Sequence, residues 1–139
     1  MQRTFVMVKP DGVQRRLAGE ILRRFESRGL RIVGLKQLVP NRQLAEAHYA
    51  IHASRPFYGE LVQFIISGPV VAMVLEGTEA IALCRTMIGA TKPLDALPGT
   101  IRGDFTTELK ANLVHGSDSE LSAKTEIALW FRPEELLPE

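Results

Sequence analysis

Cysteine and excess charge are what this chain lacks most. Its 139 residues contain a single cysteine, Cys84, so no disulfide can form within the chain. Basic and acidic residues nearly balance, at 17 and 16, and the net charge is +1. Such a chain has no overall field that attracts nucleic acid, so nucleic acid is not an expected partner. Any anion-binding site must therefore be local.

Long apolar runs are also missing. The apolar stretch 5–8 is too short for the hydrophobic part of a secretory signal, and the longest apolar region, 64–75, is interrupted by Gly68-Pro69. No membrane partner is therefore expected. The lone cysteine lies in a helix-like run, where a small apolar residue is its ordinary role. These features predict a cytoplasmic protein in a reducing compartment.

Apolar residues nevertheless make up 45% of the chain. A domain of this length buries roughly two-thirds of the surface that its unfolded chain exposes. No internal repeat or low-complexity segment divides the sequence. We therefore expect residues 1–139 to form a single domain.

Short apolar stretches bounded by turn residues predict four strands, at 5–8, 30–39, 70–75 and 114–115. Helical spacing predicts five helices, of which the first carries Leu17, Ile21 and Phe25 and closes at Gly29. The second is expected to run as far as Ile51. The expected caps or first residues of the other four are Asn41, Tyr58 or Gly59, Thr78, and Ser119 or Ser122.

The element order β-α-β-α-α-β-α-β predicts an α+β fold. Each crossover helix can pack on one face of a four-stranded antiparallel sheet, as in a ferredoxin-like α/β sandwich. Residues 89–103 contain two prolines and three glycines and show no helical or strand period. We expect a long loop there, and long loops inside small domains are usually functional.

The octet 112–119, with sequence NLVHGSDS, holds the strongest candidate for chemistry. The imidazole of His115 is nucleophilic near neutral pH because one ring nitrogen keeps a lone pair. Gly116 and the hydroxyl of Ser117 can admit a charged substrate closely. A lone histidine beside Leu113 and Val114 is also typical of a buried strand end, so the octet alone leaves both interpretations open.

Phosphate recognition would have to rely on side chains. The sequence contains neither G-x-x-x-x-G-K-[ST] nor G-x-G-x-x-G after a strand. The polar residues available for phosphate oxygens are Lys9, Arg85, Thr91, Arg102 and Asn112. Each of these residues alone is more typical of a solvated surface than of a phosphate site.

Two other clusters have simpler interpretations. His48 and His52 are four residues apart, but no third zinc ligand is evident, so surface or core positions are favoured and no metal-binding residue of the protein is predicted. The arginines between residues 15 and 28 are interrupted by Glu20 and Glu26, as on a solvated helix face.

Four longer motifs in the same order make the sequence resemble the nucleoside diphosphate kinase family. They are RTFVMVKPDGV at 3–13, SGPVVAMV at 67–74, PGTIRGDF at 98–105 and the octet at 112–119. The resemblance extends from Arg3 to about Leu136. It implies transfer of the γ-phosphate of a nucleoside triphosphate, mainly ATP, to nucleoside diphosphates by a ping-pong route through a phosphohistidine.

The resemblance also implies roles for individual residues. His115 matches the nucleophile and Glu126 the carboxylate that orients its ring, with Tyr49 and Ser117 as supporting groups. Asn112, assisted by Lys9, would contact the ribose, and Phe57 would stack on the base. The phosphate oxygens would be held by Lys9, Arg85, Thr91 and Arg102.

The family further implies Mg²⁺ on the nucleotide phosphates, with Asp118 at most an indirect contact. It implies a homo-oligomer, either a tetramer or a hexamer, in which residues 93–99 match a segment that contacts neighbours in hexamers. One alternative is a relative that has lost catalysis and serves as an assembly or regulatory subunit. Another is an RNA-binding module, but residues 70–75 contain no aromatic residue on which bases could stack.

Overall fold

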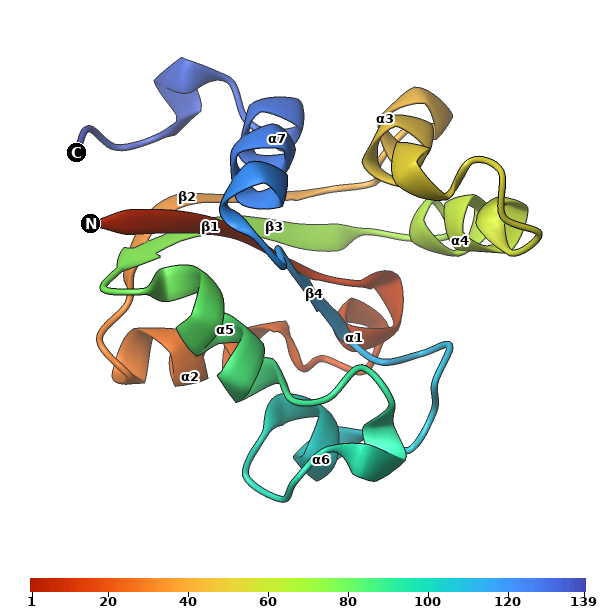
Figure 1. Cartoon of the computed structure of the whole chain (residues 1–139), viewed down its shortest axis with the longest axis horizontal. Coiled ribbons are helices and arrows are strands. Elements are labelled where there is room, and N and C mark those ends of the chain that lie inside the picture. Colours follow the sequence, from red (N-terminus) through yellow and green to blue (C-terminus); the bar gives the residue numbers. More distant parts are fainter.

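A computed structural model describes residues 1–139 as a four-stranded antiparallel sheet between two layers of helices (Figure 1). The spatial order of the strands is β2-β3-β1-β4, and every neighbouring pair is antiparallel. This arrangement confirms the predicted α+β fold. The strands are β1 (Gln2–Val8), β2 (Arg31–Leu38), β3 (Val70–Gly77) and β4 (Val114–Gly116).

The helices account for most of the remaining chain, and none is long and apolar enough to cross a membrane. They are α1 (Pro10–Gln14), α2 (Ala18–Ser27), α3 (Arg42–His48), α4 (Tyr58–Ile65), α5 (Ala80–Ile88), α6 (Ile101–Phe105) and α7 (Glu120–Trp130), with 3-10 helices η1 (Ala50–His52), η2 (Pro93–Asp95) and η3 (Pro133–Glu135).

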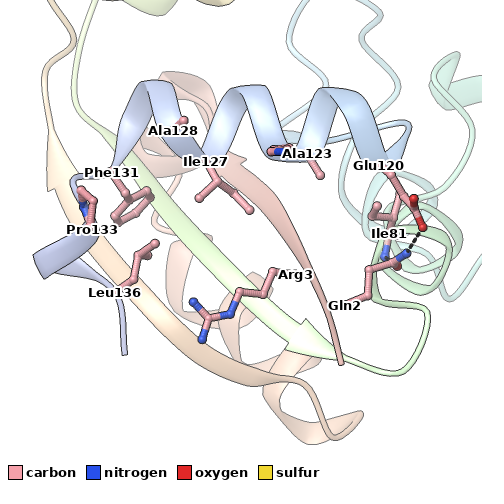
Figure 2. Close-up of a pocket in the computed structure, with 11 residues that line it drawn as sticks. Gln2, Arg3, Ile81, Glu120, Ala123, Ile127, Ala128, Phe131, Pro133 and Leu136 are labelled. Atoms are coloured by element: carbon pink, nitrogen blue, oxygen red, sulfur yellow. Dashed lines mark hydrogen bonds between the residues drawn. The ribbon is translucent and has the colours of Figure 1, made fainter. Parts of the chain in front are cut away.

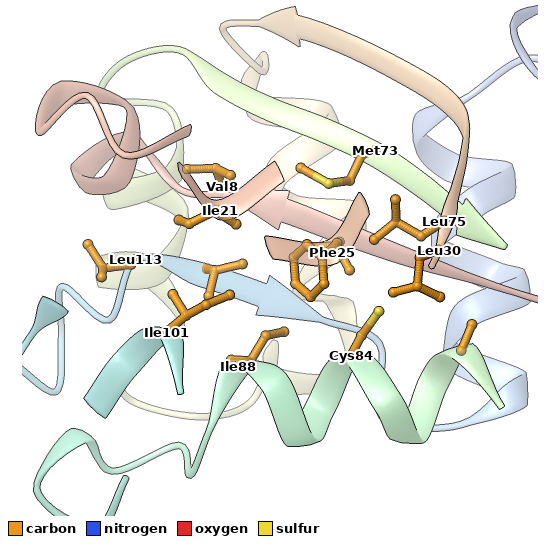
Figure 3. Packing of buried hydrophobic residues seen from close by; sticks show 13 residues of the cluster. Val8, Ile21, Phe25, Leu30, Met73, Leu75, Cys84, Ile88, Ile101 and Leu113 are labelled. Atoms are coloured by element: carbon orange, nitrogen blue, oxygen red, sulfur yellow. The ribbon is translucent and has the colours of Figure 1, made fainter. Parts of the chain in front are cut away.

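The sheet separates two apolar clusters because successive side chains of a strand point to opposite faces. Val6 and Val8 of β1 pack into one cluster with Ile21 of α2 and Ile88 of α5 (Figure 3). Alternate residues of β1 and β3 pack on the other face with side chains of α3, α4 and α7, and this cluster holds Phe5, Met7, Ala45, Tyr49, Val62, Ile65, Val70, Ala72, Val74 and Trp130. Both faces of β1 and β3 are thus buried.

Both faces of the sheet are apolar, and helices cover both of them, so each crossover packs on one face as predicted. The crossovers through α2 and α5 cover one face. The β2–β3 connection carries α3 and α4 to the opposite face, where α7 also lies (Figure 1). This second layer brings α3 and α7 together.

Two predicted helix limits are wrong. Thr78 does not cap α5; that helix begins at Ala80, and the side chain of Gln2 accepts a hydrogen bond from the Ile81 backbone N–H at 2.9 Å. The second predicted helix ends at His48, and Ile51 lies in η1 with 85% of its side chain exposed. The spacing of apolar residues along the chain cannot reveal a hydrogen bond from a distant strand, nor can it show that an apolar residue such as Ile51 is exposed.

The long segment 89–103 is not entirely loop. It contains η2 and the start of α6, whose N-cap Thr100 accepts a hydrogen bond from the Gly103 backbone N–H at 3.0 Å. A five-residue helix is too short to show a sequence period. Its formation turns the buried side chain of Arg102 toward β4.

Candidate active site

The backbone places His115 at the middle of β4, opposite Met7 of β1. Its ring lies on the face of the sheet that α3 and α7 cover, with the ring centroid 6.0 Å from that of Phe5. The side chain is about one-quarter exposed. His115 is therefore neither fully buried in the core nor free in solvent.

A carboxylate fixes one nitrogen of the His115 ring. The Nε2 atom lies 2.9 Å from Oε1 of Glu126, on α7. Burial acts to raise the pKa of Glu126, but the hydrogen bond from His115, its charge and the hydrogen bond from Ser117 outweigh this effect and lower the pKa. An ionised carboxylate only accepts hydrogen bonds. We therefore assign the proton to Nε2, which leaves Nδ1 with a lone pair.

Ser117 supports the same carboxylate. Its buried hydroxyl donates to Oε1 of Glu126 at 2.5 Å and also lies 3.3 Å from the Phe5 carbonyl oxygen. Glu126 is carried by a well-defined helix, because Ser119 and Ser122 form a reciprocal capping box at its start. The start at Ser119 was one of the two predicted. The structure thus brings His115, Ser117 and Glu126 together.

His48 belongs to this cluster, although the sequence favoured a surface or core position. Its ring is nearly perpendicular to that of His115, with centroids 4.7 Å apart. Nδ1 of His48 accepts a hydrogen bond from Nε1 of Trp130 at 3.1 Å. Burial, followed by the charges of His115 and Lys9, lowers the pKa of His48 to about 3. The bond from Trp130 fixes the tautomer with the proton on Nε2, so His48 is a neutral donor.

The same cluster has the spacing of a metal site, since ligand atoms of His48, His115 and Glu126 lie within 4.8 Å of one another. A metal ligand needs a free nitrogen lone pair. Nδ1 of His48 is occupied by Trp130, and its Nε2 carries the proton. The arrangement therefore suits hydrogen bonding better than metal coordination.

Tyr49 follows His48 at the end of α3, and its ring centroid lies 4.8 Å from that of His48. Burial and the charge of Glu126 raise the pKa of Tyr49 to about 12. The hydroxyl therefore remains a proton donor at neutral pH. Tyr49 joins the cluster through His48, and no direct bond to His115 is formed.

Three basic residues, Lys9, Arg85 and Arg102, form a cationic layer around β4, the strand that carries His115. Nζ of Lys9 donates to Oδ1 of Asn112 at 2.9 Å. Burial and the charge of Arg102 lower the pKa of Lys9 to about 8.

The Arg102 guanidinium donates to the carbonyl oxygens of Asn112, Gly89 and Val114 at 3.2, 3.2 and 2.7 Å. Arg102 is only 4% exposed, and burial with the charge of Arg85 lowers its pKa to about 10.

Arg85 and Thr91 lie at the outer side of this layer. Arg85 donates to the Gly116 carbonyl oxygen at 3.2 Å, next to His115. It lines an open pocket of about 420 Å³ with Thr91 and Thr100. Lys9, Arg85 and Arg102 thus contact residues at the two ends of β4, and Thr91 shares a pocket with Arg85.

Phe57 stands apart from these groups. It precedes α4, is 40% exposed and has its ring centroid 5.6 Å from that of His52. The structure gives it no direct contact with His115 or with the cationic layer. An exposed ring at this position is free to stack on a flat ligand.

A separate groove lies elsewhere on the molecule. It has a volume of about 500 Å³ between α7 and the C-terminal segment, and Ile127, Phe131 and Leu136 line it (Figure 2). None of the predicted site residues contributes to its wall. We therefore place the candidate active site at His115 and not at this groove.

Known proteins match the chain over nearly its whole length. The sequence profile described as nucleoside diphosphate kinase matches residues 2–136. The chain is 62% identical to the cytosolic nucleoside diphosphate kinase of Dictyostelium discoideum over 138 residues, which cover 99% of this chain and 89% of that protein. It is also 62% identical to a Picosynechococcus nucleoside diphosphate kinase over 136 residues, covering 98% and 91% of the two chains.

Solved structures agree. A nucleoside diphosphate kinase family protein from Babesia bovis superposes with a TM-score of 0.97 and 47% identity, covering 100% of this chain and 94% of the other. A halophilic nucleoside diphosphate kinase from Halobacterium salinarum, solved in complex with CDP, superposes with a TM-score of 0.96 and 52% identity. The match covers 99% of this chain and 92% of the other. Sequence and fold together show that this chain belongs to the nucleoside diphosphate kinase family, whose members transfer a phosphate from nucleoside triphosphates to nucleoside diphosphates.

Proposed function

We propose that this nucleoside diphosphate kinase works by a ping-pong mechanism in which Nδ1 of His115 carries the phosphoryl group. One observation carries the proposal: the 2.9 Å bond from Nε2 to Glu126, which occupies one ring nitrogen and leaves Nδ1 as the nucleophile. The carboxylate also stabilises the positive charge that the ring acquires when Nδ1 attacks. The fixed ring orientation pre-organises this attack.

In the first half-reaction the Nδ1 lone pair attacks the γ-phosphorus of a nucleoside triphosphate such as ATP. The bond from that phosphorus to the β–γ bridging oxygen breaks, and its electron pair leaves with the nucleoside diphosphate. In the second, a terminal oxygen of another nucleoside diphosphate attacks the phosphohistidine. The P–N bond breaks, and its electron pair returns to Nδ1.

Side chains around β4 would hold the nucleotide. Arg85, Thr91 and Arg102, with Lys9, can donate to phosphate oxygens and offset negative charge during in-line transfer. Three of the five N–H donors of Arg102 are used by carbonyls, so two remain for phosphate. Asn112, held by Lys9, would contact the ribose, and the exposed ring of Phe57 would stack on the base without reading its edges.

Members of the family use a divalent cation, and we propose Mg²⁺. When bound with the nucleotide, Mg²⁺ would neutralise part of the negative charge on the phosphates. Asp118 fits an indirect contact, because Oδ1 accepts from Ser122 at 2.9 Å and the carboxylate lines a small pocket with Arg85. We propose no dedicated protein cage for the ion, because Mg²⁺ usually keeps several of its waters.

Ser117, Tyr49 and His48 would each support His115 in a different way. Ser117 holds Glu126, and its hydroxyl stays near the ring. The Tyr49 hydroxyl, kept protonated by its raised pKa of about 12, can donate to a phosphoryl oxygen. His48 supplies a neutral edge that adds no charge beside the nucleophile.

We further propose that residues 1–139 act as one domain in a cytoplasmic homo-oligomer, either a tetramer or a hexamer. The edge strand β2 exposes Leu35, and the segment 93–99 exposes Leu94 and Leu97 at 77% and 73%, as subunit contacts require. The Dictyostelium relative is named cytosolic. Sedimentation at several concentrations will give the assembly size.

The direct test is a labelling and chase experiment. The protein is incubated with Mg²⁺ and γ-labelled ATP, freed of nucleotide, tested for acid-labile label and then mixed with GDP or a deoxynucleoside diphosphate. We expect acid-labile label that moves to either acceptor. A protein that binds nucleotide without acquiring label would instead be a silent assembly or regulatory subunit. Salt-dependent affinity for single-stranded RNA would support an RNA-binding role.

Replacing Glu126 by glutamine should slow phosphoenzyme formation at least about 100-fold, the lower end of the range for a positioned acid–base group. The amide can donate to Nε2 and so favour the wrong tautomer. Rapid-quench labelling with ATP measures the rate. Glu134→Gln, an exposed carboxylate in η3, is the matched control. Equal rates for Glu126→Gln and the control would contradict the role of Glu126.

The lowered pKa of Lys9 predicts a pH dependence of nucleotide binding. Below about pH 8 the amine is charged in the free protein, and it loses its charge as the pH rises through that value. Affinity for ADP should therefore decrease by about tenfold from pH 7 to pH 9.5, as one charge-assisted hydrogen bond is lost. Calorimetric titration measures the dissociation constant. A Lys9→Met variant should bind weakly and show no step near pH 8; a step of the same size there would contradict the assignment.

A further inference from the structure

The backbone just before His115 is strained. Leu113 is fully buried and has a φ of 77°, a left-handed value that a leucine rarely adopts. The backbone N–H of Val114 donates to the Asn112 carbonyl oxygen at 2.9 Å and closes a three-residue turn around Leu113. A γ-turn of this hand is uncommon and unfavourable. Something in the surrounding structure must hold it.

The β1–α1 connection provides part of that hold. The Lys9 backbone N–H donates to the Leu113 carbonyl oxygen at 2.8 Å, and Oδ2 of Asp11 accepts from the Leu113 backbone N–H at 3.0 Å. The approach is so close that a Cβ on Gly12 would lie 2.9 Å from the Leu113 carbonyl oxygen. Both backbone polar groups of Leu113 are therefore bound by one short segment.

Arg102 holds the same turn from the other side, through the carbonyl oxygens of Asn112 and Val114. Arg102 also belongs to the proposed phosphate-binding set. Asp11 does not, since its carboxylate is directed at the backbone of Leu113 and its Oδ1 is buried without a partner. The charge of Asp11 raises the pKa of Lys9, but Asp11→Ala and Asp11→Asn both remove that charge. The difference between the two variants therefore isolates the bond to Leu113.

We infer that Asp11 is a positioning residue, whose carboxylate holds the Leu113 amide in the strained turn and thereby sets the positions of Asn112 and His115. Only two residues, Leu113 and Val114, separate these side chains, so the geometry of the turn fixes the ribose contact relative to the nucleophile. Loss of the acceptor would let the turn relax toward an unstrained backbone and displace Nδ1. The inference rests on the proposed role of His115.

The test compares Asp11→Ala, which removes the acceptor, with Asp11→Asn, which keeps an oxygen acceptor at the same place. We expect Asp11→Ala to slow phosphoenzyme formation about 100-fold, the cost of a displacement on the order of 1 Å. Asp11→Asn should lose less than about tenfold, because a neutral acceptor is weaker but correctly placed. Glu135→Ala removes a carboxylate that also accepts a backbone N–H, from Arg132 at 2.8 Å, but far from the turn, and should leave the rate unchanged.

Two further measurements separate positioning from loss of folding. Hydrogen exchange of the Leu113 amide should be faster in Asp11→Ala than in wild type, under conditions where both are folded. In a Leu113→Gly background, where the left-handed backbone is unstrained, Asp11→Ala should lower the rate less than about tenfold. Because Leu113→Gly also removes a buried side chain, a merely destabilising substitution would have an equal or larger effect in that background.

The outcomes are distinguishable. If wild type acquires no acid-labile label, the role of His115 fails and the inference fails with it. If wild type is labelled and folded Asp11→Ala is labelled at the same rate, only the role of Asp11 is overturned. If Asp11→Asn loses as much rate as Asp11→Ala, the bond to Leu113 is not what matters. Slow labelling, rescue by asparagine and faster Leu113 exchange together support the inference.

Discussion

Replacing His115 by alanine is expected to abolish phosphotransfer, with a loss of at least about 10⁴-fold. No other group in the cluster can take over as the nucleophile. Nδ1 of His48 is occupied by Trp130, and Tyr49 keeps its proton at neutral pH because its pKa is raised to about 12. Rapid-quench labelling with γ-labelled ATP, followed by an acid-lability test, measures the loss.

Nucleotide binding should survive this substitution. Asn112 accepts hydrogen bonds from Lys9 and Arg102, and Arg102 also donates to the backbone of β4. None of these bonds uses the His115 ring. The dissociation constant for ADP should therefore stay within about tenfold of wild type. His48→Asn is the matched histidine control and should still acquire acid-labile label, at a lower rate. Label on His115→Ala would mean that another residue carries the phosphoryl group.

Features of the fold that depend on neighbouring residues were predictable from the sequence. Asn41 accepts from the Leu44 N–H and caps α3, and Ser119 caps α7, as the pattern of polar residues before apolar faces indicates. The strand ending at Lys9-Pro10 and the short strand at His115 were also predictable, because proline and glycine interrupt ladders locally. The family motifs added the partner Glu126, which lies eleven residues from His115.

Features that depend on contacts between distant segments were not predictable. The bond from Trp130 to His48 spans 82 residues, and only the fold places α3 against α7. A single tryptophan on the apolar face of the last helix was a weak signal, since a buried indole N–H needs an acceptor. The left-handed backbone of Leu113 had no signal at all, because nothing in its own sequence favours that conformation and the bonds that hold it come from Lys9, Asp11 and Arg102.

The buried side chain of Arg102 should have two separable functions, and its substitution should reveal both. Arg102→Met removes donors from three carbonyl oxygens, two of which flank the strained turn. The Asn112 carbonyl oxygen keeps its bond from the Val114 N–H, whereas those of Gly89 and Val114 lose the Arg102 donor. An unsatisfied buried acceptor costs about 1–3 kcal/mol, so we expect a decrease of about 3 kcal/mol in the free energy of unfolding. Phosphotransfer should decrease at least about 100-fold, because a phosphate ligand is lost as well.

Arg102→Lys separates the two functions. Lysine restores the charge but not the planar fork that reaches several carbonyls at once, so it should recover part of the nucleotide affinity and little of the stability. Arg23→Met, on the exposed face of α2, is the matched control and should change stability by less than about 0.5 kcal/mol. Chemical denaturation and ADP titration of the four proteins measure both quantities. If Arg102→Met unfolds at the same denaturant concentration as wild type, the carbonyl bonds contribute nothing and Arg102 acts on phosphate alone.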